Sequence, residues 1–338
     1  MNDLPHNNCV SAPHEQPSMP QLRLGLAMWN HAHWRDSVYG EGCQSSERLA
    51  RYAQVFNTVE GNTSFYATPN PPTVNNWRDA TPDDFRFTFK LPQAITHHKQ
   101  LQHCNEELHD FFSVMTPLLE KTGIWKIQLP AHFGPNALPI LADFLRQLPD
   151  GLEYGVEVRH PQFFAKGDAE RALNRLLIER GCNRIIMDSR PLFALPATTA
   201  AIVDAHKKKP RVPVHAIATG HSPVVRFIGQ PDNAVTSVCA AIDSDGQTIE
   251  TGEQTLPKDN DAFFTNWLTQ LPMWLAQGRT PYLFVHTPDN ADAPAVAIRL
   301  YQRLQAEMAK QHSSLALPKL QLHSSGASAQ SQQLGLEW

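Results

Sequence analysis

The segment FRFTFKL, residues 85–91, decides the fold because apolar and polar side chains alternate along it. Neighbouring side chains of a β-strand point to opposite faces of a sheet, so this strand has one apolar face and one polar face. The apolar face holds Phe85, Phe87, Phe89 and Leu91, and the polar face holds Arg86, Thr88 and Lys90. An apolar face of this size has to be covered by helices. The polar face then points to the inside of a closed sheet.

Seven more short runs of strand-forming residues accompany this strand, and longer amphipathic segments separate them. The expected strands are residues 22–29, 56–60, 85–90, 124–129, 154–159, 184–188, 224–228 and 282–286. The expected helices are residues 46–55, 72–80, 105–121, 137–147, 168–180, 261–276 and 293–310. Alternating strands and helices are typical of parallel β/α units, and eight such strands close a barrel. We therefore predict an α/β fold with a single (β/α)8 barrel of the TIM type.

The barrel is expected to fill most of the 338-residue chain. Residues 1–20 and 311–338 are polar and lack an apolar period, which predicts a flexible N-terminal arm and C-terminal tail around a barrel domain at 21–310. Irregular inserts are expected after the sixth strand, at about 189–223, and after the seventh, at about 230–258. Long connections after barrel strands usually build the active-site face.

Composition narrows the class of protein. A net charge of −4 disfavours a general nucleic-acid binder, although a local nucleic-acid site stays open. The five cysteines are scattered and form no C-x-x-C pair, so neither a disulfide framework nor a zinc knuckle is indicated. The chain has no apolar run of the roughly 20 residues that span a bilayer and no secretory signal. These features predict a cytoplasmic protein with no membrane partner.

Polar side chains lie on the inner face of several expected strands. The same alternation places Glu60, Lys126, Gln128, Glu157, Arg159 and Arg226 inside the barrel, with Asp188 as a further candidate. Parallel strands that are buried on both faces are normally apolar, and a buried charge has to be paired. For the deeper Arg86 and Lys126, a structural salt-bridge network and a functional site are both open. At the carboxyl ends of the strands, position favours a functional site.

Five segments in the same order resemble the YecE-like family, domain of unknown function 72. They are GLAMWNHAHW (25–34), NTVEGNTSFY (57–66), FRFTFKLPQAITH (85–97), IQLPAHF (127–133) and GVEVRHPQFF (155–164). The resemblance implies a β/α barrel and supports the strand register given above. It implies no reaction, because the family is named for lacking an established one.

The resemblance is looser in the last third of the chain. Where family members usually show an R-x-H-G run, this chain has Arg226 followed by Ile228, so an imidazole is missing. Near the last strand the family tends to carry asparagines, whereas this chain reads FVHTPDNADAPAVA, with His286, Thr287 and Asn290. These departures raise two alternatives, a changed substrate or lost catalysis.

Inward cations outnumber inward carboxylates, which favours a small phosphorylated or carboxylated ligand. Two strand-end carboxylates also suit general acid and base chemistry in a hydrolase, lyase or isomerase. The candidate catalytic residues are Glu60, Glu157 and His97. The candidate substrate-binding residues are Trp29, Asn62, Tyr66, Lys90, Gln128, Arg159, Arg226 and His286, and Trp34 and Phe65 are further candidates for an aromatic wall or cap.

Two other functions stay open. A metal-dependent phosphodiesterase would draw its ligands from Glu60, His97, Glu157, His160, Asp188 and His286, although no H-x-H or H-E-x-x-H pattern supports it. A non-catalytic ligand-binding protein would keep the pocket without the chemistry. The basic run at 206–211 is interpreted as a solvated loop. The sequence indicates no particular cofactor and no oligomeric state.

Overall fold

Eight parallel strands close a barrel in the computed structural model, which describes residues 20–231, 241–242, 248–249 and 260–310. The strands are β1 (Arg23–Leu26), β2 (Thr58–Gly61), β3 (Arg86–Lys90), β4 (Thr122–Gln128), β5 (Tyr154–Glu157), β6 (Asn183–Asp188), β7 (Val224–Ile228) and β10 (Tyr282–His286). Each pairs with its neighbours along the chain, and β1 pairs with both β2 and β10. The predicted TIM-type barrel is confirmed.

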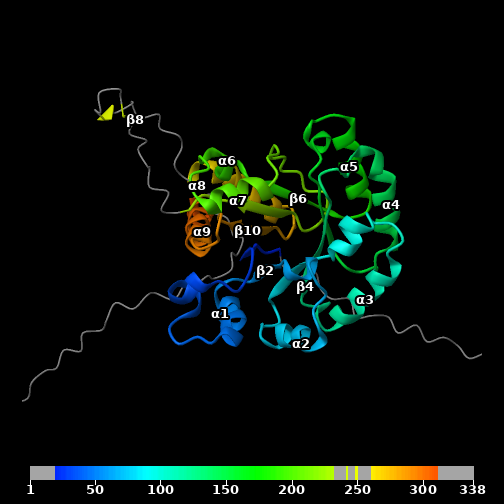
Figure 1. Cartoon of the computed structure of the whole chain (residues 1–338), viewed down its shortest axis with the longest axis horizontal. Helices are drawn as coiled ribbons and strands as arrows, with labels where there is room; N and C mark the ends of the chain where they lie inside the picture. Colours follow the sequence, from blue (N-terminus) through cyan, green and yellow to red (C-terminus); the bar gives the residue numbers. More distant parts are fainter. Residues whose placement is uncertain (1–19, 232–240, 243–247, 250–259, 311–338) are drawn as a thin grey trace, which may run out of the picture.

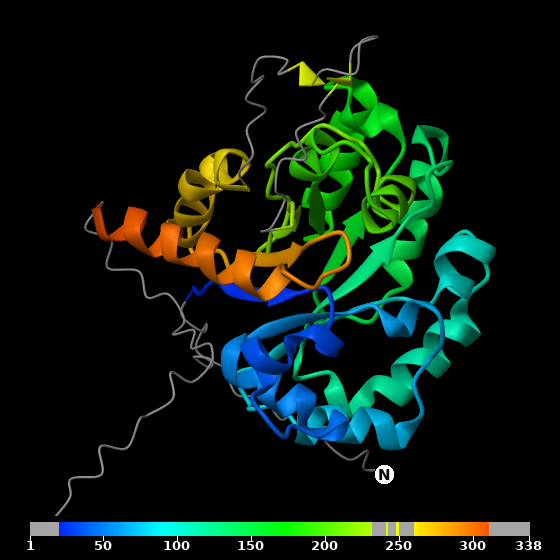
Figure 2. The ribbon, with the colours of Figure 1, turned by 60° about the vertical axis from the view of Figure 1, so that its left-hand side comes forward.

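Helices surround the strands on the outside of the barrel, as Figures 1 and 2 show from two directions. They are α1 (Arg48–Val55), α2 (Pro71–Asp79), α3 (Asn105–Met115), α4 (Leu138–Gln147), α5 (Asp168–Glu179), α6 (Arg190–Ala194), α7 (Ala200–Lys208), α8 (Asn260–Ala276) and α9 (Ala293–Lys310). In Figure 2, α9 runs alongside β1, which joins the last helix to the first strand. Within the described ranges, no helix is both long and apolar enough to cross a membrane.

Local sequence explains where these helices begin. The Asn70 side chain accepts a hydrogen bond from the backbone N–H of Thr73 at 2.9 Å, and Pro71 occupies the first turn of α2. Such a cap satisfies a backbone donor that the helix itself leaves unpaired, and proline suits the first helical position. The first turn of α5 carries Asp168 and Glu170, which interact favourably with the positive end of the helix dipole.

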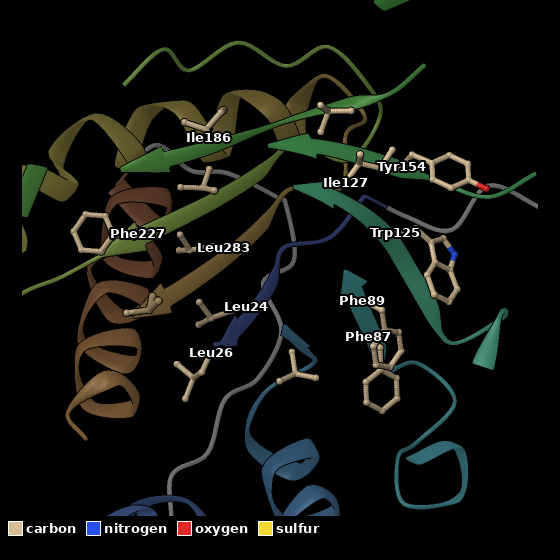
Figure 3. Close-up of a cluster of buried hydrophobic side chains, with 14 of the residues drawn as sticks. Leu24, Leu26, Phe87, Phe89, Trp125, Ile127, Tyr154, Ile186, Phe227 and Leu283 are labelled. Atoms are coloured by element: carbon tan, nitrogen blue, oxygen red, sulfur yellow. The ribbon is translucent and has the colours of Figure 1, made fainter. Parts of the chain in front are cut away.

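The outer face of the barrel is the main apolar core. Figure 3 shows its side chains standing off neighbouring strands: Leu24, Leu26, Phe87, Phe89, Trp125, Ile127, Tyr154, Ile186, Phe227 and Leu283. All of them are buried, and in β3 they are the residues that alternate with Arg86, Thr88 and Lys90. The alternation read from FRFTFKL is therefore confirmed.

The interior of the barrel is divided into two layers along its axis. The amino-terminal half is filled by a separate apolar cluster of Ile124, Ile185, Val224, Tyr282 and Phe284. Charged and polar side chains fill the carboxyl half, because the next inward positions along these strands are occupied by Lys126 in β4, Arg226 in β7 and His286 in β10. The apolar layer closes the barrel below the charged one, so the charged groups face the carboxyl ends of the strands, which we call the mouth.

Two predicted inward residues lie elsewhere. Arg86 stands at the amino-terminal end of β3, where it is half-buried and donates to the carbonyl oxygens of Asp83 and Phe85. Asp188 is paired with outward-facing Phe227, so its carboxylate points towards the helices, where it accepts from the Trp267 indole at 2.9 Å. Neither belongs to the charged layer. Arg86 lies at the opposite end of its strand, and alternation along β6 turns Met187 inward and Asp188 outward.

The irregular regions are only partly described. The insert after β6, where one helix and a loop were expected, contains two helices, α6 and α7, followed by a loop. In the insert after β7, β8 (Ala241–Ile242) pairs antiparallel with β9 (Thr248–Ile249). The predicted arm at 1–20, apart from its last residue, the tail at 311–338 and the rest of 232–259 lie outside the described residues.

A substitution at Gly25 of β1 tests how closely the barrel strands pack. A methyl group there would lie 2.1 Å from the backbone carbonyl oxygen of Thr58, so β1 and β2 would have to separate. We expect Gly25→Ala to lower the free energy of unfolding by about 1–3 kcal/mol, a typical cost of overpacking in a tightly packed interior. Chemical denaturation measures this.

Gly167 is the matched control, because a methyl group at this position meets nothing within 4 Å. Gly167→Ala should change the free energy of unfolding by less than about 1 kcal/mol. Equal effects of the two substitutions would contradict the strand spacing.

Candidate functional site

Arg226, at the centre of β7, joins two glutamates from different strands. Its Nε lies 2.8 Å from Glu60 Oε1, and its Nη1 donates to Glu157 Oε2 at 2.8 Å. Its Nη2 also donates to Glu60 Oε2 at 3.1 Å. Only 3% of Arg226 is exposed, so these charge-assisted bonds form away from water. The planar guanidinium therefore fixes the distance between β2 and β5 across the barrel.

Glu60 is the most heavily paired group of the site. It is completely buried, accepts from Lys126 Nζ at 2.9 Å and lies 3.1 Å from His286 Nε2. Burial alone would raise the pKa of this carboxyl, but Arg226, Lys126 and His286 together hold the pKa well below its usual range. The Asn62 amide, 3.4 Å away, completes the surroundings. Glu60 is therefore a permanent anion at neutral pH.

Glu157 is held in the same way from the other side of the site. Arg159, two residues along the same strand end, donates to Glu157 Oε1 through Nε at 3.0 Å and Nη2 at 2.7 Å. Burial would raise the pKa of Glu157, but Arg226, Arg159 and Lys90 outweigh burial and lower it strongly. We call Glu60, Lys126, Glu157, Arg159, Arg226 and His286 the ionic network.

Lys90 lies beside the ionic network without a carboxylate of its own. Its Nζ donates to Gln128 Oε1 at 2.8 Å and lies 5.6 Å from the centre of the Phe65 ring. Burial and the neighbouring Arg226 lower the pKa of this amine well below its ordinary value, against the opposing effect of Glu157. The contacts of Lys90 Nζ are therefore a neutral amide and an aromatic ring. A bound anion at this position would stabilise the charged form of the amine.

His97, Phe65 and Tyr66 form an aromatic edge at the mouth. The His97 ring packs edge-on against Phe65 with centroids 5.0 Å apart, and its Nδ1 lies 2.9 Å from Thr96 Oγ1. Burial and the charge of Arg159 lower the pKa of His97, so the ring is neutral at pH 7. Tyr66 follows Phe65 and is 73% exposed. Lys90 and His97 thus lie beside the network, and Tyr66 lies against Phe65 at the same edge. Their binding and catalytic roles stay predictions.

Lys209 is a member of the site that the sequence interpretation missed. The run 206–211 is not a solvated loop, because its first three residues end α7 and Lys209 is half-buried above the network. Burial and Arg226 lower the pKa of Lys209 to about 8, while Glu60 and Glu157 oppose this shift. In the described part of the chain, its Nζ forms no hydrogen bond and no ion pair. Among consecutive lysines, no sequence signal distinguishes this one.

Helix α7 is held over one side of the mouth by an apolar cluster. Ile202 and Ala205 of the helix pack with Met187 and Ile228, the last inward residues of β6 and β7. Ile228 is completely buried. Ile228 therefore supports α7, and it contributes no polar group to the site.

Two predicted aromatic residues lie apart from the network. Trp29 packs edge-on against Trp77 of α2 and against outward-facing Phe87, with centroid distances of 5.3 and 6.3 Å. The regular strand ends at Leu26, so the alternation no longer applies at Trp29. The indole of Trp34 donates to the Asn290 carbonyl oxygen at 2.8 Å, before α9. Both tryptophans support the helix layer.

The metal-ligand set proposed from the sequence is not assembled. Asp188 is bound by Arg190 and Trp267 outside the barrel, and His160 accepts from the backbone N–H of Gln162 at 3.3 Å. Within the described ranges, no group of three or more histidine, cysteine, aspartate or glutamate side chains is placed to hold a metal ion.

The pairing of Glu60 predicts a large stability effect. Glu60→Gln keeps the shape but removes the negative charge beside Arg226 and Lys126, which leaves buried Lys126 without a carboxylate partner and Arg226 with Glu157 alone. We expect the free energy of unfolding to fall by about 3–5 kcal/mol, the usual cost of breaking a buried ion pair. Denaturant titration should show no comparable loss for Glu41→Gln, whose side chain is exposed.

The burial of His286 leads us to predict that the fold loses stability in acid. Burial lowers its pKa to about 3, although Glu60 opposes the shift, so the folded chain leaves this ring neutral while the unfolded chain protonates it below about pH 6.5. Stability due to His286 is therefore lost as pH falls from about 6.5 towards 3. At pH 4.5 this loss reaches about 2–3 kcal/mol.

His286→Gln removes the titrating ring and should reduce the loss of stability between pH 7 and pH 4.5 by that amount. Unfolding curves at both pH values test this. Identical losses in the variant and the original chain would show that His286 is not buried as a neutral ring.

Comparisons with known proteins show the family and the fold of this chain. The sequence model of the family described as "Protein of unknown function DUF72" matches residues 23–322. The UPF0759 protein YecE of Escherichia coli K12 is 44% identical over 298 residues, which cover 88% of this chain and 98% of that protein.

Two crystal structures of DUF72 family proteins share the fold. The one from Enterococcus faecalis aligns with a TM-score of 0.60 at 19% identity and covers 84% of this chain and 96% of its own. The one from Thermotoga maritima aligns with a TM-score of 0.58 at 20% identity and covers 84% and 99%. With the match over nearly the whole barrel and the close relative, the chain belongs to the DUF72 family, that of the YecE-like proteins.

Proposed function

We propose that this barrel binds a small phosphorylated or carboxylated metabolite at its mouth. The observation that carries the proposal is the charge balance of the site. Five cationic side chains, Lys90, Lys126, Arg159, Lys209 and Arg226, surround two carboxylates, Glu60 and Glu157. An anion would balance this excess and form charge-assisted hydrogen bonds with it.

The cations nearest the mouth are the ones suited to bind the ligand. Lys126 and Arg226 are at most 3% exposed and are used in holding the glutamates. Lys90, Arg159 and Lys209 keep partial solvent access, and Gln128 and Asn62 offer neutral hydrogen-bonding groups beside them. We assign the anion to these three cations. Phe65 and Tyr66 supply an apolar wall for the rest of the ligand.

Glu60 and Glu157 are assigned a holding role instead of the acid and base role predicted from the sequence. A general base works best with a pKa near the working pH, and cationic partners hold both carboxyl pKa values far below it. His97 is neutral at pH 7 and lies at the mouth, so it is the better base for hydrolase, lyase or isomerase chemistry.

A non-catalytic binding protein is the second candidate, and Ile228 favours it. This buried side chain replaces the family's usual imidazole and leaves no proton carrier at the end of β7. A metabolite that binds tightly and is recovered unchanged would support this alternative. The phosphodiesterase hypothesis is not carried forward, because its ligand set does not converge. That nucleic acid is an unlikely partner and that the protein is cytoplasmic both stay predictions.

Inorganic phosphate and succinate test the anion site directly. Both should raise the melting temperature in a thermal-shift assay, because a ligand of the folded state stabilises it by mass action. Arg159→Gln should weaken this effect at least tenfold in ligand concentration, which corresponds to about 1.4 kcal/mol.

Arg86→Gln is the matched control, since Arg86 is a half-buried arginine of β3 that stands at the opposite end of the barrel. Its response to both anions should equal that of the original chain. Equal losses in both variants, or no stabilisation by either anion, would contradict the proposal.

Proton uptake on binding is a further expected result. An anion beside Lys209 favours the charged amine and raises the pKa from about 8, so binding above that pH takes up a proton. Titration calorimetry with succinate at pH 8.5, in two buffers of different ionisation enthalpy, measures the uptake. Affinity should fall as pH rises above about 8. Binding that takes up no proton would contradict the assignment of Lys209.

A further inference from the structure

We propose that Lys209 is a nucleophile that forms an imine with the carbonyl group of a small anionic oxo compound, such as a 2-oxo acid. The inference rests on the proposed function, because the same mouth must first bind the anionic end of that compound. It names a narrower ligand class, one that carries a ketone or aldehyde next to its negative charge. It also gives α7 a chemical role.

The position of Lys209 is fixed by the backbone around it. The Ser189 hydroxyl, directly after β6, donates to the carbonyl oxygen of Pro210 at 2.9 Å. His206 Nε2 lies 3.1 Å from the Leu192 carbonyl oxygen, which joins α7 to α6. These contacts hold the residue between them at the carboxyl end of β6, where barrel enzymes keep their reacting groups.

Among the described residues the amine of Lys209 has no partner, whereas the other lysines of the site are engaged. Lys126 Nζ donates to Glu60 at 2.9 Å, and Lys90 Nζ donates to Gln128 at 2.8 Å. Lys209 Nζ has neither kind of partner among the described residues, yet the charges of Arg226, Glu60 and Glu157 act on it. The glutamates are already bound by Arg226, so neither is left over to pair with Lys209.

The surroundings suit a nucleophilic amine. Neighbouring cations and partial burial favour the neutral form of a lysine, which carries the reactive lone pair. The groups facing Lys209 are Arg226 and Arg159 as cations, Glu60 and Glu157 as anions, and the neutral ring of His286. At pH 8, close to the pKa of Lys209, a carbonyl compound whose anion is held by Arg159 and Lys90 would therefore meet an amine that is partly unprotonated.

The reaction is a condensation without oxidation or reduction. The Nζ lone pair forms a bond to the carbonyl carbon, and a proton moves from nitrogen to the carbonyl oxygen. The carbon–oxygen bond then breaks, and the oxygen leaves as water with the two hydrogens of the original amine. The product is a C=N bond, which a hydride reagent reduces irreversibly to a secondary amine.

The experiment uses the full chain with pyruvate and sodium cyanoborohydride at pH 8, followed by peptide mapping in a mass spectrometer. We expect one pyruvate-derived adduct per chain, located on Lys209. Lys209→Ala should abolish it. Lys207→Ala is the matched control, because Lys207 lies on the exposed side of the same helix and should leave the labelling unchanged. Acetone, which carries the carbonyl without the carboxylate, should label Lys209 at least tenfold more slowly.

Two outcomes overturn the inference. Labelling spread over exposed lysines, or an adduct on Lys90 with none on Lys209, would remove Lys209 as the nucleophile. Lactate, which has the carboxylate of pyruvate but no carbonyl, separates this failure from failure of the proposed function. Stabilisation by lactate without any pyruvate adduct would refute the imine alone, whereas no thermal shift with lactate or phosphate would refute the anion site as well.

Discussion

The contact between Arg226 and the two glutamates is the constraint on which the rest of the site depends. One guanidinium binds carboxylates from β2 and β5 at 2.8 Å each, deep inside the barrel. Either glutamate alone would be costly to bury, and so would the arginine without them. Together they form a rigid frame across the barrel, and the remaining charged groups are placed around it.

This frame explains the layering of the barrel and the character of its mouth. Beneath it, Phe284 and its apolar neighbours exclude water, which strengthens the ion pairs, and Lys126 Nζ lies 5.4 Å from the Phe284 ring. Above it, Lys90 and Lys209 meet no carboxylate of the described ranges that is not already bound. The site therefore has a buried half that is electrostatically complete and an accessible half that is short of negative charge. Anion binding and a reactive amine both follow from that difference.

The fold was predictable from the sequence because strand alternation is a local property. FRFTFKL alone assigned both faces of β3, and the same rule correctly placed Glu60, Lys126, Glu157 and Arg226 inside. The rule failed where the strand had already ended, at Trp29, and at Asp188, whose polar side chain binds Trp267 between the strand and helix layers. A polar residue in a barrel strand can face the inside of the barrel or the helix layer, and the residue type alone does not determine which.

Lys209 was missed for a different physical reason. Its role depends on where α7 ends relative to β6, and that is set by contacts distant in the sequence, such as Ser189 with Pro210 and Ile228 with Ile202. The same limit applies to Glu60 and Glu157. Sequence placed both at strand ends but did not show that Arg226 binds them together, which turns two candidate bases into a structural frame.

The most direct test of this account is a crystal structure of the full chain soaked with selenate, with the anion located by its anomalous scattering. The account predicts Arg226 in contact with both Glu60 and Glu157, and a selenate within hydrogen-bonding distance of Lys90, Arg159 or Lys209. A structure in which Arg226 turns away from either glutamate, or in which selenate binds only outside the mouth, would contradict it.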